Sequence, residues 1–278
     1  ATILMTGELW FRVPEIIEIR LEGQTPKGVY PKDVILSVVG KMKADGAIYK
    51  AIDFTGSYVE SLNVAGRMAL CNMAVEMGAK TAYMQPNTDV LEYVSKRAVR
   101  PFEVMYSDPD FQYAESYVFD VSELEPQLAC PHSVDNVDSI SHILKKGEVL
   151  LNQGYIGSCT GGREEDIAIA AEILRGKHIP EYARLVVVPA SSEVMLSCMD
   201  KGYIQDLMNA GATIVSPGCG ACLGAHEGIL APEEVCISST NRNFPGRMGA
   251  KQARIYLASP ATVAASILNG RITDPRNC

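Results

Sequence analysis

The stretch EVLLNQGYIGSCTGGREEDIAIAAEIL, residues 148–174, carries the strongest indication of the fold. Residues 148–156 are mainly apolar and predict a strand, the glycines within 157–162 predict a tight turn, and the apolar spacing of 164–174 predicts a helix. A strand that leads through a glycine turn into a helix is the building unit of parallel sheets. Residues 148–174 therefore predict an α/β protein.

The alternation of strands and helices extends along the whole chain. Further strands are predicted at 7–13, 16–22, 47–54, 103–105, 116–119, 184–189, 212–215 and 235–238, and further helices at 31–39, 63–77, 193–208 and 262–268. The polar, proline-containing stretch 120–147 resembles a linker. We therefore predict two domains, residues 1–127 and 128–278, each with a mostly parallel sheet flanked by helices.

Composition excludes several classes of protein. The 278 residues are 47% hydrophobic, which rules out a disordered or collagen-like chain, and the net charge of −8 argues against a nucleic-acid-binding protein. No apolar run is long enough to cross a membrane. The eight cysteines are too few for a disulfide scaffold, so we expect a cytoplasmic protein in which closely spaced cysteines bind metal or perform redox chemistry.

The most specific short motif is PGCGACLG, residues 217–224, which follows the strand predicted at 212–215. Ligands of open α/β sheets bind at the carboxyl ends of strands, and the glycines allow close backbone approach. Cys219 and Cys222 fit a redox dithiol, a zinc site completed by His226, or two buried thiols in a glycine-rich turn. The Cys-x-x-Cys spacing alone does not decide among these three.

A third cysteine helps to choose among the redox, zinc and structural alternatives. Cys159 also follows a predicted strand and lies in a glycine turn, so the topology brings it to the same edge of the sheet as Cys219 and Cys222. A closed structural zinc site normally has four protein ligands. Three thiolates without a clear fourth ligand suit an iron–sulfur cluster with one open iron.

Several motifs together resemble the aconitase superfamily over essentially the whole chain. They are most similar to the large subunits of 3-isopropylmalate dehydratase and homoaconitase. The matching stretches are GELWF (7–11), VPE (13–15), KDVIL (32–36), CNMAVEMGA (71–79), IGSCT (156–160), PGCGACLG (217–224) and NRNFPGR (241–247). Gly161 departs from the family pattern, which has Asn at this position, and so removes one side chain near the predicted cluster.

The resemblance implies a [4Fe–4S] cluster held by Cys159, Cys219 and Cys222, in which one iron has no cysteine ligand. It also implies that Asn241 donates hydrogen bonds to the cluster sulfurs. Cys71, Cys130, Cys198 and Cys236 are expected to be small buried residues, and Cys278 incidental. Neither His132 nor His226 is assigned a role.

The resemblance further implies a substrate site. Arg242 and Arg247 are expected to bind carboxylates through their guanidinium groups, and Arg242 is also a catalytic candidate. Asn72 is expected to contact substrate, and Glu76 to be an active-site carboxylate. Asn72 and Glu76 lie four residues apart in the predicted helix and so share one face.

The activity implied is that of a hydro-lyase acting on a malate-type hydroxy acid, foremost 3-isopropylmalate dehydratase in leucine biosynthesis. Homoaconitase, or a dehydratase of dimethylmalate or citrate, is the alternative. The expected partner is a small subunit that carries a swivelling domain, and the expected substrate is a hydroxy-diacid or hydroxy-triacid. Because the chain lacks an initial Met and the family's N-terminal His and Asp segment, we expect it to be inactive alone.

Two hypotheses from other classes stay open. Cys219 and Cys222 suit a thiol redox protein, which would not require Cys159. A non-catalytic, iron-responsive relative is the other, and the presence of both Arg242 and Arg247 argues against it.

Overall fold

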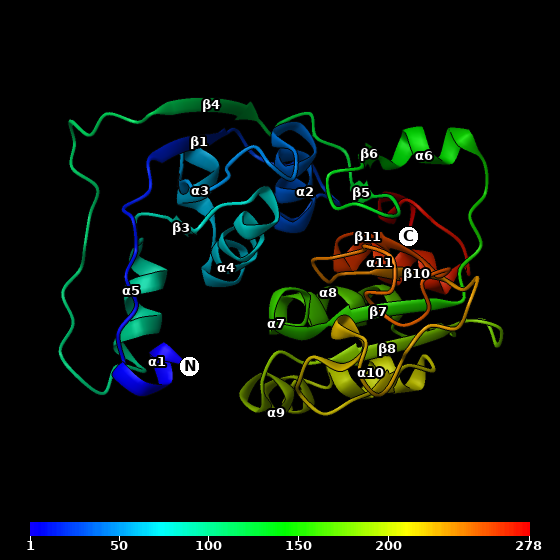
Figure 1. Ribbon diagram of the computed structural model, residues 1–278. Coiled ribbons are helices and arrows are strands. Elements are labelled where there is room, and N and C mark those ends of the chain that lie inside the picture. The colour runs from blue at the N-terminus through cyan, green and yellow to red at the C-terminus, as the bar shows by residue number, and fades with distance from the viewer.

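The computed structural model describes residues 1–278 and contains two sheets (Figure 1). The first sheet consists of β1 (Ile16–Glu22), β2 (Ala51–Thr55), β3 (Thr81–Tyr83) and β4 (Glu115–Asp120). Its strands run parallel in the order β3-β2-β1-β4. The α/β fold class with mostly parallel sheets is confirmed for this half.

Helices connect the parallel strands of the first sheet, as parallel pairing requires. They are α2 (Pro31–Met42), α3 (Ser57–Ser61), α4 (Val64–Met73), the 3₁₀ helix η1 (Ala74–Met77) and α5 (Thr88–Ser95). Asn63 caps α4 by accepting a hydrogen bond from the Gly66 backbone N–H, and Gly78 ends η1 in the left-handed conformation. The predicted helix 63–77 is thus confirmed, with its last turn tightened to 3₁₀.

The second sheet has seven strands. They are β5 (Gln127–Ala129), β6 (Val137–Ser139), β7 (Gln153–Gly157), β8 (Arg184–Val188), β9 (Thr213–Ile214), β10 (Val235–Ser238) and β11 (Arg254–Leu257). Their order is β6-β5-β11-β10-β7-β8-β9, in which β5 runs antiparallel to both β6 and β11 and all other pairs are parallel. This half is therefore also mostly parallel, as predicted.

The remaining helices belong to the second half, apart from α1 (Thr2–Thr6). They are α6 (Ile140–Lys146), α7 (Ser158–Gly161), α8 (Glu164–Leu174), α9 (Ser192–Asp200), α10 (Tyr203–Asn209), α11 (Pro260–Leu268) and the 3₁₀ helices η2 (Gly220–Leu223) and η3 (Pro275–Asn277). No helix is long and apolar enough to cross a membrane.

Two apolar clusters form the core. One packs Ile156 and Val187 of the second sheet against α8, α10 and α11. The other combines Tyr155 and Val188, which alternate to the opposite face, with the first sheet and its helix α2. The cluster that contains Tyr155 and Val188 is therefore shared by both halves of the chain. The division into domains 1–127 and 128–278 remains our proposal, and β5 begins at Gln127.

Two predicted strands are wrong. Residues 7–13 form no strand after α1, and Trp10 and Val13 remain 84% and 87% exposed. Residues 103–105 are likewise irregular, and Met105 is 72% exposed. A strand is stable only beside a hydrogen-bonded neighbour, and neither segment has one.

Other elements were misjudged in extent. The stretch predicted as a linker, 120–147, contains β5, β6 and α6, because two three-residue strands extend the second sheet. The helix predicted at 193–208 is two helices, since Gly202 adopts a left-handed conformation between α9 and α10. The strand predicted at 47–54 begins only at Ala51, and β3, β11 and α5 were not predicted.

Candidate active site

Cys159 lies at the carboxyl end of β7. The segment predicted as a tight turn, 157–162, instead forms the single-turn helix α7, entered through Ser158 at φ +59°. The Cys159 thiol is exposed, and the Asn72 side-chain amide donates toward its Sγ at 3.8 Å. A residue of α4 thus reaches across from the first half of the chain to the predicted cluster ligand.

Gly161 leaves no room for a side chain. A Cβ atom at this position would lie 2.4 Å from Ser239 Oγ and 2.6 Å from Ser239 Cβ. The Ser239 hydroxyl also donates to the Gly161 carbonyl at 3.0 Å. Glycine at position 161 thus allows this segment, two residues after Cys159, to pack closely against Ser239.

Cys219 and Cys222 lie in the loop after β9, at the same edge of the sheet as Cys159. The Tyr155 hydroxyl donates to the Cys219 carbonyl at 3.0 Å and so fixes this loop to β7. Gly220 is needed there, because its φ is +52° and a Cβ would lie 2.8 Å from the Tyr155 hydroxyl. Cys219 is exposed and Cys222 half-buried, so they are not the two buried thiols of the simplest alternative.

The three thiols suit an iron–sulfur cluster better than a single ion. All three are free, and Asn72 and Arg247 direct donors toward Cys159 and Cys222, each at 3.8 Å. No group of three His, Cys, Asp or Glu side chains converges on one ion position, as a structural zinc would require. In an iron–sulfur cluster each of the three cysteines would bind a different iron, so the thiolates would not need to converge on one ion position.

The remaining cysteines differ from these three. Burial raises the pKa of Cys236 to about 12 and the pKa values of Cys71 and Cys198 to about 11. It also raises the pKa of Cys130 and Cys278. The thiolate is the metal-binding form, so this chemistry disfavours all five as ligands. The predicted burial is confirmed for Cys198 and Cys236, whereas Cys71 and Cys130 are only half-buried.

Asn241 follows β10 and lies at the centre of a hydrogen-bond network. Its amide nitrogen donates to Asn72 Oδ1 and to Thr160 Oγ1, both at 3.0 Å. Its amide oxygen accepts from Lys32 Nζ at 3.3 Å. The network links the segment before Arg242 to both α4 and the Cys159 helix. Lys32 was not predicted as a site residue.

Arg242 and Glu76 form an ion pair between the two halves. Arg242 Nε lies 2.8 and 3.1 Å from the two Glu76 carboxylate oxygens. The Glu76 side chain is only 9% exposed, while that of Arg242 is 40% exposed. Glu76 therefore anchors the guanidinium and leaves its Nη atoms accessible.

The Glu76–Arg242 pair lines a cavity of about 230 Å³ together with His132 and Phe244. His132 is exposed, and its loop gave no sequence signal that would assign it to the site. The cavity therefore combines a carboxylate, a guanidinium and an imidazole group. Groups of these kinds can bind a small acid and exchange a proton with it.

Arg247 packs near the ring of Phe244, which also lines this cavity. Its guanidinium carbon is 5.6 Å from the centre of the Phe244 ring, and its Nη2 lies 3.8 Å from Cys222 Sγ. Its Nε is buried and has no hydrogen-bond partner. A buried donor without a partner is costly, and this one is closed to solvent.

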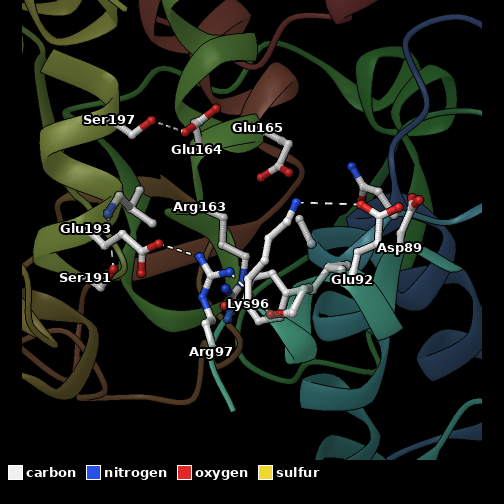
Figure 2. Close-up of a pocket in the computed structure, with 15 residues that line it drawn as sticks. Asp89, Glu92, Lys96, Arg97, Arg163, Glu164, Glu165, Ser191, Glu193 and Ser197 are labelled. Atoms are coloured by element: carbon white, nitrogen blue, oxygen red, sulfur yellow. Dashed lines mark hydrogen bonds and ion pairs between the residues drawn. The ribbon is translucent and has the colours of Figure 1, made fainter. Parts of the chain in front are cut away.

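A larger cavity, of about 450 Å³, lies elsewhere, between α5 and the start of α8 and α9 (Figure 2). Its lining contains none of the predicted site residues. Two of its basic side chains form ion pairs within it: Arg97 with Glu193, and Lys96 with Glu92 at 3.6 Å (Figure 2). The smaller cavity is the better candidate, because Glu76 and Arg242 of the predicted site line it.

Comparison with known proteins identifies the relatives of this chain. The profile of the aconitase family (aconitate hydratase) matches residues 1–270. The "Probable methanogen homoaconitase large subunit" of Methanosarcina mazei is 49% identical over 99% of this chain and 69% of its own length. The "3-isopropylmalate dehydratase large subunit 1" of Methanopyrus kandleri is 49% identical over 99% of this chain and 65% of its own length.

The "3-isopropylmalate dehydratase large subunit" of Hydrogenobaculum is 44% identical over 99% of this chain and 64% of its own length. This chain therefore spans about two thirds of the length of the relatives it matches. Among solved structures, Thermococcus kodakaraensis aconitase X (holo-form) aligns with 84% of this chain and 50% of that chain, at a TM-score of 0.44 and 13% identity.

Proposed function

This chain belongs to the aconitase family, and from that premise we propose that it is the cluster-binding large subunit of a hydro-lyase that dehydrates a malate-type hydroxy acid. We propose 3-isopropylmalate dehydratase of leucine biosynthesis as its activity, which is the name of two of the relatives above. Homoaconitase is the second candidate, favoured by the Methanosarcina mazei relative. One observation carries the proposal: Asn241 bridges the Cys159 helix and α4, beside the Glu76–Arg242 pair.

Membership of the family implies an iron–sulfur cluster. We propose that Cys159, Cys219 and Cys222 hold it as [4Fe–4S], with one iron free of cysteine. Such an iron acts as a Lewis acid toward the substrate hydroxyl when the cluster is bound. The free thiols and the donors of Asn72 and Arg247 at 3.8 Å support this ligand set.

The arginines supply the substrate's counter-charges in this proposal. Arg242 binds a substrate carboxylate through its accessible Nη atoms while Glu76 holds its Nε. Arg247 binds a second carboxylate through its guanidinium group, which lies beside Cys222 Sγ. Two fixed guanidinium groups orient a diacid and stabilise the negative charge that develops beside a carboxylate when a proton is removed.

The remaining roles follow from the same contacts. We assign Asn241 to the cofactor and Asn72 to both the cluster edge and the substrate, since Asn72 bonds Asn241 and points to Cys159. We assign Glu76 to the active site as the carboxylate that positions Arg242. We propose a small subunit as partner, as the relatives' names indicate, and the cytoplasm, where thiols stay reduced, as its location.

Anaerobic reconstitution with iron and sulfide tests this proposal. The chain should gain the broad visible absorbance of an iron–sulfur cluster, and Cys159→Ala should lose it, while Cys236→Ala, a buried cysteine outside the site, should retain it. A redox dithiol of Cys219 and Cys222 would be indifferent to Cys159. With the family's N-terminal His and Asp segment and a small subunit both supplied, 3-isopropylmalate and homocitrate assayed in parallel separate the two candidate activities.

A further inference from the structure

Lys32 is a buried cation at the junction of the two halves. It lies in the first turn of α2 and is only 4% exposed. Its Nζ donates to the Thr240 carbonyl at 2.7 Å, to Asn241 Oδ1 at 3.3 Å and to Met73 Sδ at 3.0 Å. Fully buried lysines are rare unless they are paired, and none of these three partners is a carboxylate.

The ammonium group fixes the orientation of two amides in turn. An ammonium has donors but no acceptor, so Asn241 must face Lys32 with its oxygen. The Asn241 nitrogen then donates to Asn72 Oδ1 at 3.0 Å. Since Asn72 accepts with its oxygen, its own nitrogen faces Cys159 Sγ at 3.8 Å. Reversing either amide would place two donors or two acceptors opposite each other.

We propose that Lys32 is a positioning residue for the cluster: through Asn241 and Asn72 it directs an amide donor onto the sulfur of Cys159. The proposal rests on the proposed function, in which Cys159 is a cluster ligand. Hydrogen bonds to ligand sulfur raise the reduction potential of iron–sulfur clusters, and the groups behind a metal ligand typically alter metal affinity 10- to 100-fold. Lys32 Nζ itself bonds none of the three cysteines.

The charge of Lys32 is retained near neutral pH. Burial lowers its pKa to about 8, and nearby acidic groups, Glu76 foremost, oppose that shift. The facing acidic groups are Glu76 from η1, Asp166 from α8, Asp33 from α2 and the Cys222 thiol. At pH 7 the amine is therefore mostly protonated, as the direction of its hydrogen bonds requires.

Lys32→Met tests the relay, since it removes the donors and keeps an apolar stem of similar length. Lys41→Met is the matched control, because Lys41 lies in the same helix but packs over the Phe119 ring, outside the site. In the apoprotein, the side-chain amide NMR signals of Asn241 and Asn72 should both move in Lys32→Met and stay in Lys41→Met. Asn72 does not touch Lys32, so an unmoved Asn72 signal in a folded Lys32→Met protein overturns the proposal.

The reconstituted cluster provides a second readout. Lys32→Met and Asn72→Ala should both lower the midpoint potential in an EPR-monitored titration and speed iron loss about tenfold or more, while Lys41→Met should match the wild type. If Lys32→Met does not fold, Asn72→Ala and Asn241→Asp, which keep Lys32, carry the test. Wild-type potentials in both overturn the proposal. A wild-type chain that binds no cluster defeats the proposed function instead, and the NMR comparison still tests the relay.

Discussion

Arg242 holds its side chain against Glu76 through Nε alone, at 2.8 and 3.1 Å from the two carboxylate oxygens. Lysine has a single terminal ammonium, so Arg242→Lys cannot contact both Glu76 and a substrate carboxylate. Losing a hydrogen bond to a charged group costs about 1.5–3 kcal/mol, which is roughly a 10- to 150-fold loss in kcat/KM. The measurement is steady-state dehydration of 3-isopropylmalate by the enzyme assembled with the family's N-terminal His and Asp segment and a small subunit.

Arg20→Lys is the matched control for Arg242→Lys. Arg20 also donates to a glutamate, Glu18, at 3.0 Å, but lies on β1 outside the candidate site. We expect its kcat/KM to stay within twofold of the wild type. Equal losses in the two variants would mean that Arg242 has no special role in substrate binding.

Thiol accessibility distinguishes the cysteines residue by residue. At pH 8, a thiol whose pKa is about 12, as burial makes that of Cys236, is ionised in only about one molecule in 10,000. We therefore expect iodoacetamide to label the exposed Cys159 and Cys219 of the native apoprotein well before Cys198 and Cys236. Peptide mass spectrometry over time measures the order. Reconstitution should protect Cys159 and Cys219, and early labelling of Cys236 would contradict the structure.

At the scale of elements, α7 depends on the absence of a side chain at Gly161. A Cβ there would meet Ser239 at 2.4–2.6 Å, so Gly161→Ala should displace α7 and with it Cys159. Overpacking of this kind costs about 1–3 kcal/mol in the free energy of unfolding. Urea unfolding measures the cost, and the iron content after reconstitution measures the displacement of Cys159.

Gly218→Ala is the corresponding control in the other cysteine loop. A Cβ at Gly218 would meet only the Ser216 carbonyl oxygen, at 3.9 Å, so the stability of the apoprotein should match the wild type. If Gly161→Ala is equally silent, the backbone contact with Ser239 does not position Cys159. Adding Ser239→Ala to the Gly161→Ala variant should restore only part of the lost stability, because the Cβ and carbonyl of residue 239 remain.

The elements best predicted from sequence are those whose pattern is local. Strand 16–22 alternates apolar and charged residues, and helix 164–174 has regular apolar spacing, so both agree with the structure at both ends. Strand 7–13 has a similar apolar content but fails, because only tertiary structure decides whether a strand finds a neighbour. The very short β5 and β6 were missed for the same reason.

From the order of strands and turns alone, only the positions of the cysteines in the candidate site could be predicted. The strand–turn–helix pattern brought Cys159 and Cys219 to one sheet edge, and the structure has both there. Lys32 and His132 were not found, because nothing in a local pattern marks a lysine that is buried by the opposite half of the chain. The roles assigned to the site residues remain predictions until the variants above are measured.

At the scale of the whole molecule, the candidate site exists only at the junction of the two halves. The first half contributes Lys32, Asn72 and Glu76, and the second contributes the three cysteines and the segment 241–247. The shared apolar cluster fixes one half against the other. Any change that loosens this junction should therefore affect both stability and cluster retention.

Asp33 provides the test, because from a fully buried position it joins α2 to β5, a strand of the second sheet. Its Oδ1 accepts from the Gln127 backbone N–H of β5 and its Oδ2 from the Tyr30 N–H, both at 2.9 Å. An amide has only one acceptor oxygen, so Asp33→Asn should lower the free energy of unfolding by about 1–3 kcal/mol. Urea unfolding followed by circular dichroism measures this, with the exposed Asp45→Asn as a control expected within about 0.5 kcal/mol of the wild type.

The difference in the free energy of unfolding between the wild type and Asp33→Asn should change with pH in a defined direction. Burial raises the pKa of Asp33 from 3.8 to about 7, so between about pH 4 and pH 7 the native state holds a proton that the unfolded state has released. The contribution of Asp33 to stability is therefore fully present below about pH 4 and declines as the pH rises through 7, whereas the side-chain amide of the Asp33→Asn variant does not titrate. Asp166, whose pKa burial also raises to about 7, titrates in both proteins and cancels from the difference. The advantage of the wild type over Asp33→Asn should thus be larger at pH 5 than at pH 8, and an equal or smaller advantage at pH 5 would show that the Asp33 carboxyl is not held protonated at the junction.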